Sequence, residues 1–397
     1  MAAKGNNLTQ RRREMEVAEK VRLADVVDIN TSSPPNYEGV KRYISTGAIV
    51  DGAIVESQVE MFGFSERPSR ADLYPKEGDV LFAKMQATRK TFVVDRMNSG
   101  SLYSTGFYAL TPHKDEIDTL YLSHYLDSEQ FLSAKDKECN GATQKALSSV
   151  GFKKLLVPLP PLPAQRRIAA ELDKICELKK NAETRLEKLD LLVKSRFVEM
   201  FGENQSWSKV GLLDVGECKN GVNFAPNERG YELHCIGVGN FKNFAEISNV
   251  ESMPLVSLNA RPSDDLLLRD GDILFVRSNG NKNLVGRCVV VHPRDTEVTF
   301  SGFCIRYRLA SKRLDALYVV HYLRQSQVRR LLQGRGANIQ NMSQRTLAGL
   351  SIPIPPLALQ REFAAFVEKV DKLRLNIRST VAKMDMLYRS KLQEYFG

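Results

Sequence analysis

The sequence predicts a mixed α/β protein made of two similar domains in tandem, each followed by a long helix. Three observations predict this fold: a globular composition, an internal repeat and a Pro-rich junction before each helix. Of the 397 residues, 43% are hydrophobic and 26% are charged, which suits two or three cores. The pentapeptide GDVLF at 78–82 returns as GDILF at 271–275, and YLSHYL at 121–126 returns as YVVHYL at 318–323. Repeats this far apart and in the same order indicate two diverged domains, not a short-period solenoid.

Each domain is expected to begin with strands and to continue into a helix. Short apolar runs at 41–50, 78–82 and 284–291 are bounded by Gly, Asn and Pro, which is typical of strands. Residues 117–131 predict a helical stretch. The mixture indicates a compact α/β or α+β domain.

The long helices are expected after PLPPLP at 158–163 and PIPPL at 353–357, because proline excludes a helix and then allows one to begin. Apolar residues then recur every three or four positions in the same pattern in both helices, which is typical of a coiled-coil seam. We expect an antiparallel pair that forms a coiled-coil rod with a pseudo-two-fold axis; the alternative is that each helix packs only on its own domain. The predicted seam residues are Leu172, Ile175, Leu186, Leu189, Val370, Leu373, Val381 and Met384.

The predicted boundaries follow from these features. We expect an N-terminal extension at 1–20, a first domain at 21–162, a central long helix at 163–202, a second domain at 203–357 and a distal long helix at 358–397.

The charge balance indicates an anionic partner. Lys and Arg number 57 against 47 Asp and Glu, a formal charge of +10, so nucleic acid is the first hypothesis and a membrane surface the second. No apolar run is long enough to span a bilayer, and the N-terminal segment has no apolar core for a signal peptide, so we expect a cytoplasmic protein. The six Cys are scattered, without metal-ligand or disulfide spacing.

The common catalytic motifs are not convincing in this sequence. There is no phosphate-binding P-loop, and Lys242 stands where a dinucleotide fingerprint would need its third glycine. Glu217-Cys218-Lys219 has the Glu-x-Lys form of a metal-dependent nuclease, but short matches of this kind are common by chance. His124 and His321 occupy equivalent apolar positions, which indicates buried structural histidines. No catalytic residue and no metal ligand is therefore predicted.

Three pairs of polar loops are the candidate DNA-binding surface, which we call the recognition loops. Arg and Lys suit guanine, Asn and Gln suit adenine, and Ser, Thr and additional Lys suit phosphates. The loops of the first pair follow the repeated strands, at 84–90 and 277–283; those of the second pair lie at 141–145 and 336–341, and those of the third at 43–46 and 235–238. The candidate side chains are Tyr43, Ser45, Thr46, Lys84, Gln86, Thr88, Arg89, Lys90, Thr143, Gln144, Lys145, Arg277, Ser278, Asn279, Asn281, Lys282, Asn338 and Gln340.

Taken together, these features resemble the specificity subunit of type I restriction-modification systems. The likeness rests on the doubled Pro-rich junction with Gln-Arg at 165–166 and 360–361, on the long helices ending in Phe-Gly, and on GDILFVRS at 271–278. The resemblance implies a non-catalytic subunit with two target recognition domains that bind a bipartite site in double-stranded DNA, one half-site per domain.

The resemblance also implies partners. Two methyltransferase subunits would dock on the helices and motor-nuclease subunits would join them; S-adenosylmethionine, ATP and Mg²⁺ would belong to these partners, with no cofactor in this chain. The alternatives are a free-standing nuclease or single-chain restriction enzyme with DNA-recognition domains, and a coiled-coil scaffold without DNA affinity.

Overall fold

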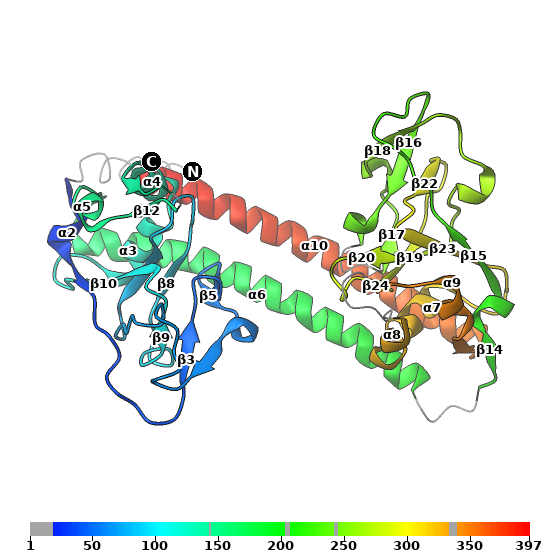
Figure 1. Cartoon of the computed structure of the whole chain (residues 1–397), viewed down its shortest axis with the longest axis horizontal. Coiled ribbons are helices and arrows are strands. Elements are labelled where there is room, and N and C mark those ends of the chain that lie inside the picture. The colour runs from blue at the N-terminus through cyan, green and yellow to red at the C-terminus, as the bar shows by residue number, and fades with distance from the viewer. Residues whose placement is uncertain (1–18, 143, 203–206, 242–244, 333–339) are drawn as a thin grey trace, which may run out of the picture. The chain divides into compact units, whose positions relative to one another are not determined.

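The computed structural model describes residues 19–142, 144–202, 207–241 and 245–332, and then 340–397. The chain divides into two compact units (Figure 1). The first unit contains the chain up to Arg185 together with Ile377–Gly397, and the second contains Leu186–Asn376. The first unit is therefore discontinuous in sequence, and the second is continuous.

The first unit is centred on a four-stranded antiparallel sheet in the order β2-β10-β7-β8. Alternate residues of the central strand face two different cores, as the twofold period of a strand requires: Phe82 lies in one apolar cluster and Leu81 in the other. A smaller sheet in the order β6-β3-β9 lies in the same unit. The strand bounds are β2 (Val27–Asn30), β10 (Phe107–Pro112), β7 (Val80–Ala83), β8 (Thr91–Val93), β6 (Glu60–Phe62), β3 (Lys41–Ile44) and β9 (Leu102–Tyr103).

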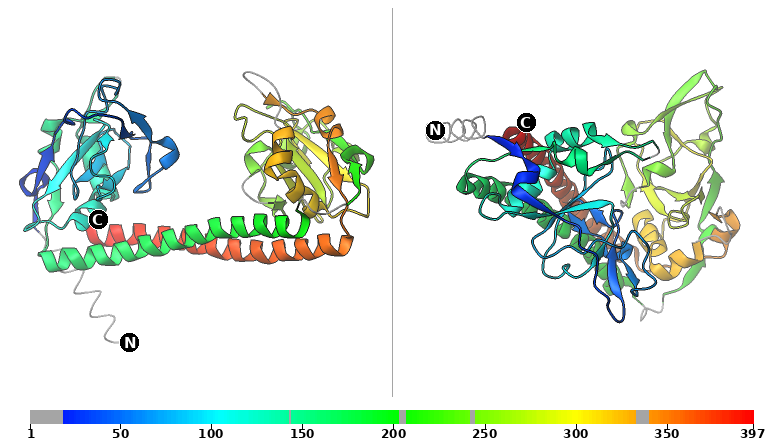
Figure 2. Two further views of the ribbon diagram at one scale, coloured as in Figure 1. Left: turned by 90° about the horizontal axis from the view of Figure 1, so that it is seen from below. Right: turned by 60° about the vertical axis from the view of Figure 1, so that its left-hand side comes forward.

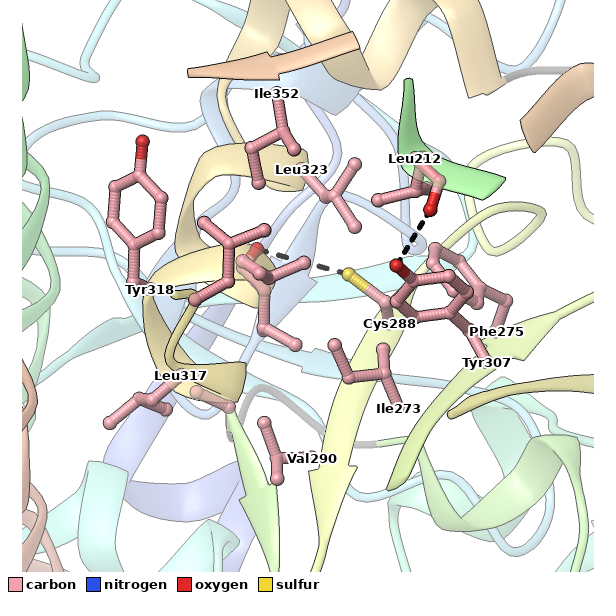
Figure 3. Packing of buried hydrophobic residues seen from close by; sticks show 14 of the residues in the cluster. Leu212, Ile273, Phe275, Cys288, Val290, Tyr307, Leu317, Tyr318, Leu323 and Ile352 are labelled. Atoms are coloured by element: carbon pink, nitrogen blue, oxygen red, sulfur yellow. Dashed lines mark hydrogen bonds between the residues drawn. The ribbon is translucent and has the colours of Figure 1, made fainter. Parts of the chain in front are cut away.

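The second unit has the same central order, extended by one strand: β15-β23-β19-β21-β17. Figure 3 shows its core, where the Tyr307 hydroxyl donates to the Leu212 carbonyl at 2.7 Å and Ile273, Phe275 and Val290 belong to the same apolar cluster. The same unit contains a three-stranded sheet, β18-β16-β22, whose strands lie in sequence between strands of the five-stranded sheet. The strand bounds are β15 (Gly216–Asn220), β23 (Cys304–Leu309), β19 (Asp272–Val276), β21 (Cys288–Val291), β17 (Glu246–Ile247), β18 (Leu255–Leu258), β16 (Tyr231–Ile236) and β22 (Val298–Phe300).

The observed strands and helices are shorter than the sequence predicted. The run 41–50 contains β3 and, after a turn, β4 (Ile49–Val50), which pairs with β5 (Ala53–Ile54). The helical stretch 117–131 is divided into α3 (Thr119–Leu126) and α4 (Glu129–Lys137), because the Ser128 side chain accepts a hydrogen bond from the Phe131 amide and caps a new helix. The second unit repeats this with α7 (Ala316–Leu323) and α8 (Ser326–Leu332).

The repeated Gln of the Pro-rich junctions fixes where each long helix starts. Gln165 is fully buried; its Oε1 accepts from the Asp118 amide at 2.8 Å, and its Nε2 donates to the carbonyls of Glu116 and Pro160 at 2.9 and 2.8 Å. Gln360 makes the same three contacts at the same distances, with the backbone of Asp315, Arg313 and Pro355. The Gln side chain thus ties the junction to the N-terminus of α3 or α7. Adjacent strand pairs close each junction: β1 (Lys20–Arg22) with β13 (Leu156–Pro158), and β14 (Lys209–Gly211) with β25 (Ser351–Pro353).

The long helices are α6 (Leu162–Phe201) and α10 (Leu357–Phe396), each of 40 residues. Both run from one unit into the other, and in each unit a segment of one packs antiparallel on a segment of the other. In the first unit, where both views of Figure 2 place the start of α6 beside the end of α10, Leu172 shares a core with Leu392. In the second unit, Val193 shares a core with Val367.

The predicted seam is partly wrong. Leu373 has 53% of its surface exposed, because the next residue, Arg374, turns inward and forms ion pairs with Asp190 and Asp371. Successive helix positions are about 100° apart, so Leu373 then faces away from the seam. Leu172, Ile175 and Val370 are buried as expected, but Leu172 contacts the end of α10 and not the region of Val370. The remaining predicted seam residues are half-buried: Leu186, Leu189, Val381 and Met384.

Candidate nucleic-acid interface

In the first unit, the structure brings the recognition loops at 84–90 and 141–145 together. The first loop leaves β7, and the second lies between β11 (Cys139–Asn140) and β12 (Ala146–Leu147). The Gln86 amide donates to the Lys145 carbonyl at 2.9 Å, the Leu147 amide donates to the Lys84 carbonyl at 2.9 Å, and Met85 bridges to Ala146. Two segments far apart in sequence thus form one polar edge.

A buried lysine that sequence reasoning missed supports this edge. Lys135 of α4 is 1% exposed, and its ammonium group donates to the carbonyls of Met85 and Thr88. Its neighbour Asp136 accepts from the Ala87 amide at 3.0 Å, where Ala87 adopts a positive φ of 54°. The one sequence signal was the spacing of Lys135 four residues after Phe131, which places it on the buried face of α4. Burying an ammonium group is costly unless it is hydrogen-bonded, so Lys135 holds the loop in one conformation.

The third loop of the first unit is attached to the first loop by Lys90. The Lys90 ammonium donates to the Thr46 carbonyl at 2.6 Å, and the Ser45 hydroxyl accepts from the Ala48 amide at 3.3 Å. Tyr43 is a correction to the predicted surface. It lies in β3 with 6% of its surface exposed and packs on Phe62, because alternate residues of this strand face the core.

The candidate side chains of this unit differ in exposure. Gln86, Gln144 and Lys145 are exposed, whereas Lys84, Thr88, Arg89 and Lys90 are half-buried. The Lys84 ammonium lies 4.5 Å from the centre of the Tyr108 ring, and burial lowers its pKa. Arg89 forms an ion pair with Glu129 at 2.6 Å. The side chains most available to DNA bases are therefore the two glutamines and Lys145.

The second unit repeats this arrangement. After β19, the strand β20 (Ser278–Asn279) pairs with β24 (Gln340–Asn341), with Ser278 opposite Asn341, and the Met342 amide donates to the Arg277 carbonyl at 2.8 Å. Ser278 corresponds to Met85 and Asn341 to Ala146, so the two loops meet at the same point as in the first unit. Arg277 is half-buried, and its Nη1 donates to the Gly302 carbonyl at 3.2 Å.

Asparagine side chains shape the tip of this loop. Asn279 Oδ1 accepts from the Asn281 amide at 2.8 Å, and Asn281 Oδ1 accepts from the Asn283 amide at 3.0 Å. These are Asx turns, which replace the Lys135 support of the first unit. Bidentate contact with adenine needs both Oδ1 and Nδ2 of an Asn, so DNA would have to share these oxygens. Asn281 and Lys282 are exposed.

Thr143 and Asn338 lie outside the described residues, and for Gln340 only the backbone pairing with Asn279 is described. At 235–238, Cys235 and Ile236 are buried residues of β16, so this segment offers less polar surface than predicted.

The Glu-x-Lys motif at 217–219 is held in ion pairs. Glu217 pairs with Arg306 at 2.9 Å, and Lys219 pairs with Asp265. Within the described ranges, no group of three or more His, Cys, Asp or Glu side chains is placed to hold a metal ion. Among the helices that the structure describes, none is long and apolar enough to cross a membrane.

The aspartates of the repeated GD-x-LF motif are structural. Asp79 and Asp272 are both 1% exposed, and each accepts a hydrogen bond from the backbone amide three residues before it. Asp79 also accepts from Asn30 and Thr111, whereas Asp272 forms a two-oxygen ion pair with Arg308.

One protein family matches this chain twice, once in each half of the sequence. The family model of the type I restriction modification DNA specificity domain matches residues 15–190 and 204–382. The chain is 23% identical over 312 residues to the StySPI specificity subunit of a type I restriction enzyme of Salmonella potsdam, covering 72% of this chain and 66% of that protein, slightly less than two thirds of it. It is 23% identical over 393 residues to the MjaVIII specificity subunit of Methanocaldococcus jannaschii, covering 89% of this chain and 86% of that one.

A solved structure is similar in fold. It comes from work on complex assembly and conformational transition of the type I R-M system, with a TM-score of 0.58 and 22% sequence identity, and the match covers 95% of this chain and 97% of that one.

Proposed function

The chain belongs to the family of type I restriction-modification DNA specificity subunits, which are non-catalytic DNA-recognition components, and we propose that each of its two units binds one half of a bipartite DNA site. Double-stranded DNA is the ligand, and a formal charge of +10 favours its approach. The proposal requires no catalytic step by this chain itself.

One observation carries the assignment of the binding surface. In both units the loop that follows the central strand pairs with the second recognition loop in the same register, Met85 with Ala146 and Ser278 with Asn341. The backbone frame is thus the same twice, while the side chains on it differ. Gln86, Gln144 and Lys145 are displayed in the first unit, and Asn281 and Lys282 in the second. A shared frame with different amide and basic side chains suits two different half-sites.

The proposal extends to partners. Methyltransferase subunits, two in number, would dock on α6 and α10, and motor-nuclease subunits would join that complex in the cytoplasm. S-adenosylmethionine, ATP and Mg²⁺ would be bound by those partners. Docking would use apolar side chains that the long helices leave exposed. They include Leu191 at 60%, Val198 at 57%, Leu375 at 60% and Met386 at 64% exposure.

The test is selection of bound sites from random duplex DNA by the full chain with its methyltransferase subunits. Gln86→Ala with Gln144→Ala should relax positions in one half-site only, and Asn281→Ala with Lys282→Ala should relax positions in the other. A lost base contact costs about 1 to 3 kcal/mol at its position, and a lost phosphate contact weakens all sequences alike and lowers the salt dependence.

Each pair of variants is the control for the other. If both pairs altered the same half-site, or if neither changed the selected sequence or the affinity, the recognition loops would not be the DNA-binding surface.

A further inference from the structure

The second unit contains a basic pocket that the recognition loops do not explain. Most of its lining residues belong to or flank α6, α7, α8 and α10 in that unit, and its volume is about 470 Å³. Cavities of this size accept small ligands. Its basic and imidazole side chains are Lys194, Arg287, His321, Arg324, Arg329 and Arg374, and Asp190 is the acidic residue that lines it.

Two residue differences distinguish this place from the equivalent place in the first unit. In the first unit, the Tyr388 hydroxyl lies 2.9 Å from His124 Nδ1 and 3.3 Å from Asp127 Oδ2, so a ring and a carboxylate occupy this space. The corresponding residues of the second unit are Val193 and Arg324. Valine removes the ring, and an arginine takes the position of the carboxylate.

The ion pair beside this space is the same in both units. Lys179 pairs with Asp385 at 2.8 Å in the first, and the corresponding Arg374 pairs with Asp190 at 2.7 Å in the second. Arg374 also pairs with Asp371, whose carboxylate acts on Arg324 as well, and Arg324 donates from Nε and Nη2 to the Cys288 carbonyl. The charges of Arg287, Arg329 and Lys194 are additional to these contacts.

Three side-chain nitrogen atoms that line this pocket are buried without a hydrogen-bond partner. Arg329 Nη1 and Arg374 Nε are donors, and the third atom is Nε2 of His321. His321 and Arg374 are 8% and 7% exposed. Leaving a buried donor unpaired is costly, so two such guanidinium donors in one pocket indicate that a ligand with acceptor atoms belongs there.

We propose that this pocket binds a small anion that carries phosphate groups. Guanidinium groups match phosphate oxygens with paired hydrogen bonds, and Arg287 and Arg329 with Lys194 supply more positive charge than a monovalent anion would balance. Arg329 also donates from Nη2 to the Asn283 carbonyl at 3.0 Å, at the end of the recognition loop of this unit. The bound anion would thus lie next to the DNA-binding surface without being part of it.

The titration of the arginines agrees with this assignment. Burial lowers the pKa of Arg324 and of Arg329, and the neighbouring Arg287 lowers both further. A multivalent anion would remove this repulsion and stabilise the second unit, because a ligand that binds only the folded state shifts the unfolding equilibrium.

The experiment is calorimetric titration of the full chain with pyrophosphate, in a chloride buffer free of phosphate and sulfate. We expect one saturable site, and a rise in the unfolding temperature on addition of pyrophosphate. Val193→Tyr places in the pocket the side chain that closes the first unit, and Arg287→Gln with Arg329→Gln removes two charges; each should weaken pyrophosphate binding by about tenfold or more. Lys312→Gln removes an exposed charge of the same unit outside the pocket and is the matched control.

The remaining arms separate the sources of the anion. If pyrophosphate and ATP bind with equal affinity, the ligand of the pocket is a free phosphate anion. If ATP binds more tightly, the ligand is a nucleotide. Both outcomes support the site. If pyrophosphate does not bind, or binds the variants and the control equally, the proposal is wrong. It is also wrong if the variants weaken duplex DNA binding and leave pyrophosphate binding unchanged, since the pocket would then be part of the DNA surface. The arginine double variant, checked for its fold by circular dichroism, decides the matter if Val193→Tyr does not fold.

Discussion

The two units make the same contacts where the long helices start. They differ in the side chains beside the ion pair that joins the two long helices in each unit. Gln165 and Gln360 bind the same three backbone groups, and the Lys179–Asp385 pair of one unit returns as Arg374–Asp190 in the other. Next to that pair, Tyr388 contacts His124 in the first unit, whereas Val193 lines a pocket in the second. The backbone frame of a repeat can therefore stay fixed while a few interior side chains change what the space beside it holds.

The largest expected effect concerns the shared junction. Gln360→Leu leaves three buried backbone groups without partners, which should lower the free energy of unfolding by about 3 to 5 kcal/mol. Gln165→Leu should have a similar effect on the first unit. Urea denaturation with one probe in each unit measures this, with exposed Gln58→Ala as the control. A loss below about 1 kcal/mol in either variant would show that the junctions are not equivalent.

The helix contacts give the next effect. Leu172 is fully buried and Leu373 is exposed, although the sequence pattern treats them alike. Leu172→Ala should therefore cost about 2 to 5 kcal/mol, and Leu373→Ala less than about 0.5 kcal/mol. If both variants lost the same free energy of unfolding in thermal unfolding, Leu373 would be part of the buried seam.

The histidines should distinguish the units by pH. Burial, followed by the charges of Arg324 and Arg374, lowers the pKa of His321 to about 3. The unfolded chain then binds a proton below pH 6.5 that the folded chain does not, so stability is complete above pH 6.5 and decreases as the pH falls towards 3. At pH 5 the loss should be about 2 kcal/mol.

Urea denaturation between pH 7.5 and 5 checks this. His321→Gln should flatten the dependence, and His113→Gln, at a half-buried position paired with Asp28, should leave it steep. A slope that His321→Gln does not change would mean that another group titrates.

The smallest effect concerns the polar cluster that closes the first unit. Tyr388→Phe keeps the ring and removes the hydroxyl that contacts His124 and Asp127, which should cost about 1 kcal/mol. Tyr322→Phe is the control in the second unit, because its hydroxyl donates to Ser351 in an exposed contact. If both variants lost the same stability, the hydroxyl of Tyr388 would have no special role in closing this space.

Much of the fold could be predicted because its signals are local and repeated. Proline junctions and threefold to fourfold apolar spacing predicted helices at 163–202 and 358–397, and the structure has Leu162–Phe201 and Leu357–Phe396. The prediction for Leu373 was wrong because neighbouring residues, here the inward Arg374, decide which side of a helix faces the seam at each position. Spacing along one chain does not contain that information.

The candidate surface was predicted less well, for a related reason. The sequence identified polar loops after the repeated strands, and the structure joins them in pairs. It did not identify Tyr43 as buried, because a tyrosine at a strand end suits either a core or a surface. Lys135 and the basic pocket were missed because each depends on residues brought together from distant parts of the chain.

The discontinuity of the first unit has a consequence for how the protein is made. Its core includes Leu392, Tyr395 and Phe396 beside Leu172, whereas the second unit is complete with residues 186–376. During synthesis the second unit can therefore finish folding before the first, although its sequence emerges later. Until residues 377–397 have been added, the apolar face of α6 that they cover stays open to water, and the nascent chain carries a surface suited to chaperones or to aggregation. The first unit can thus complete its core only after the whole of the second has been synthesised.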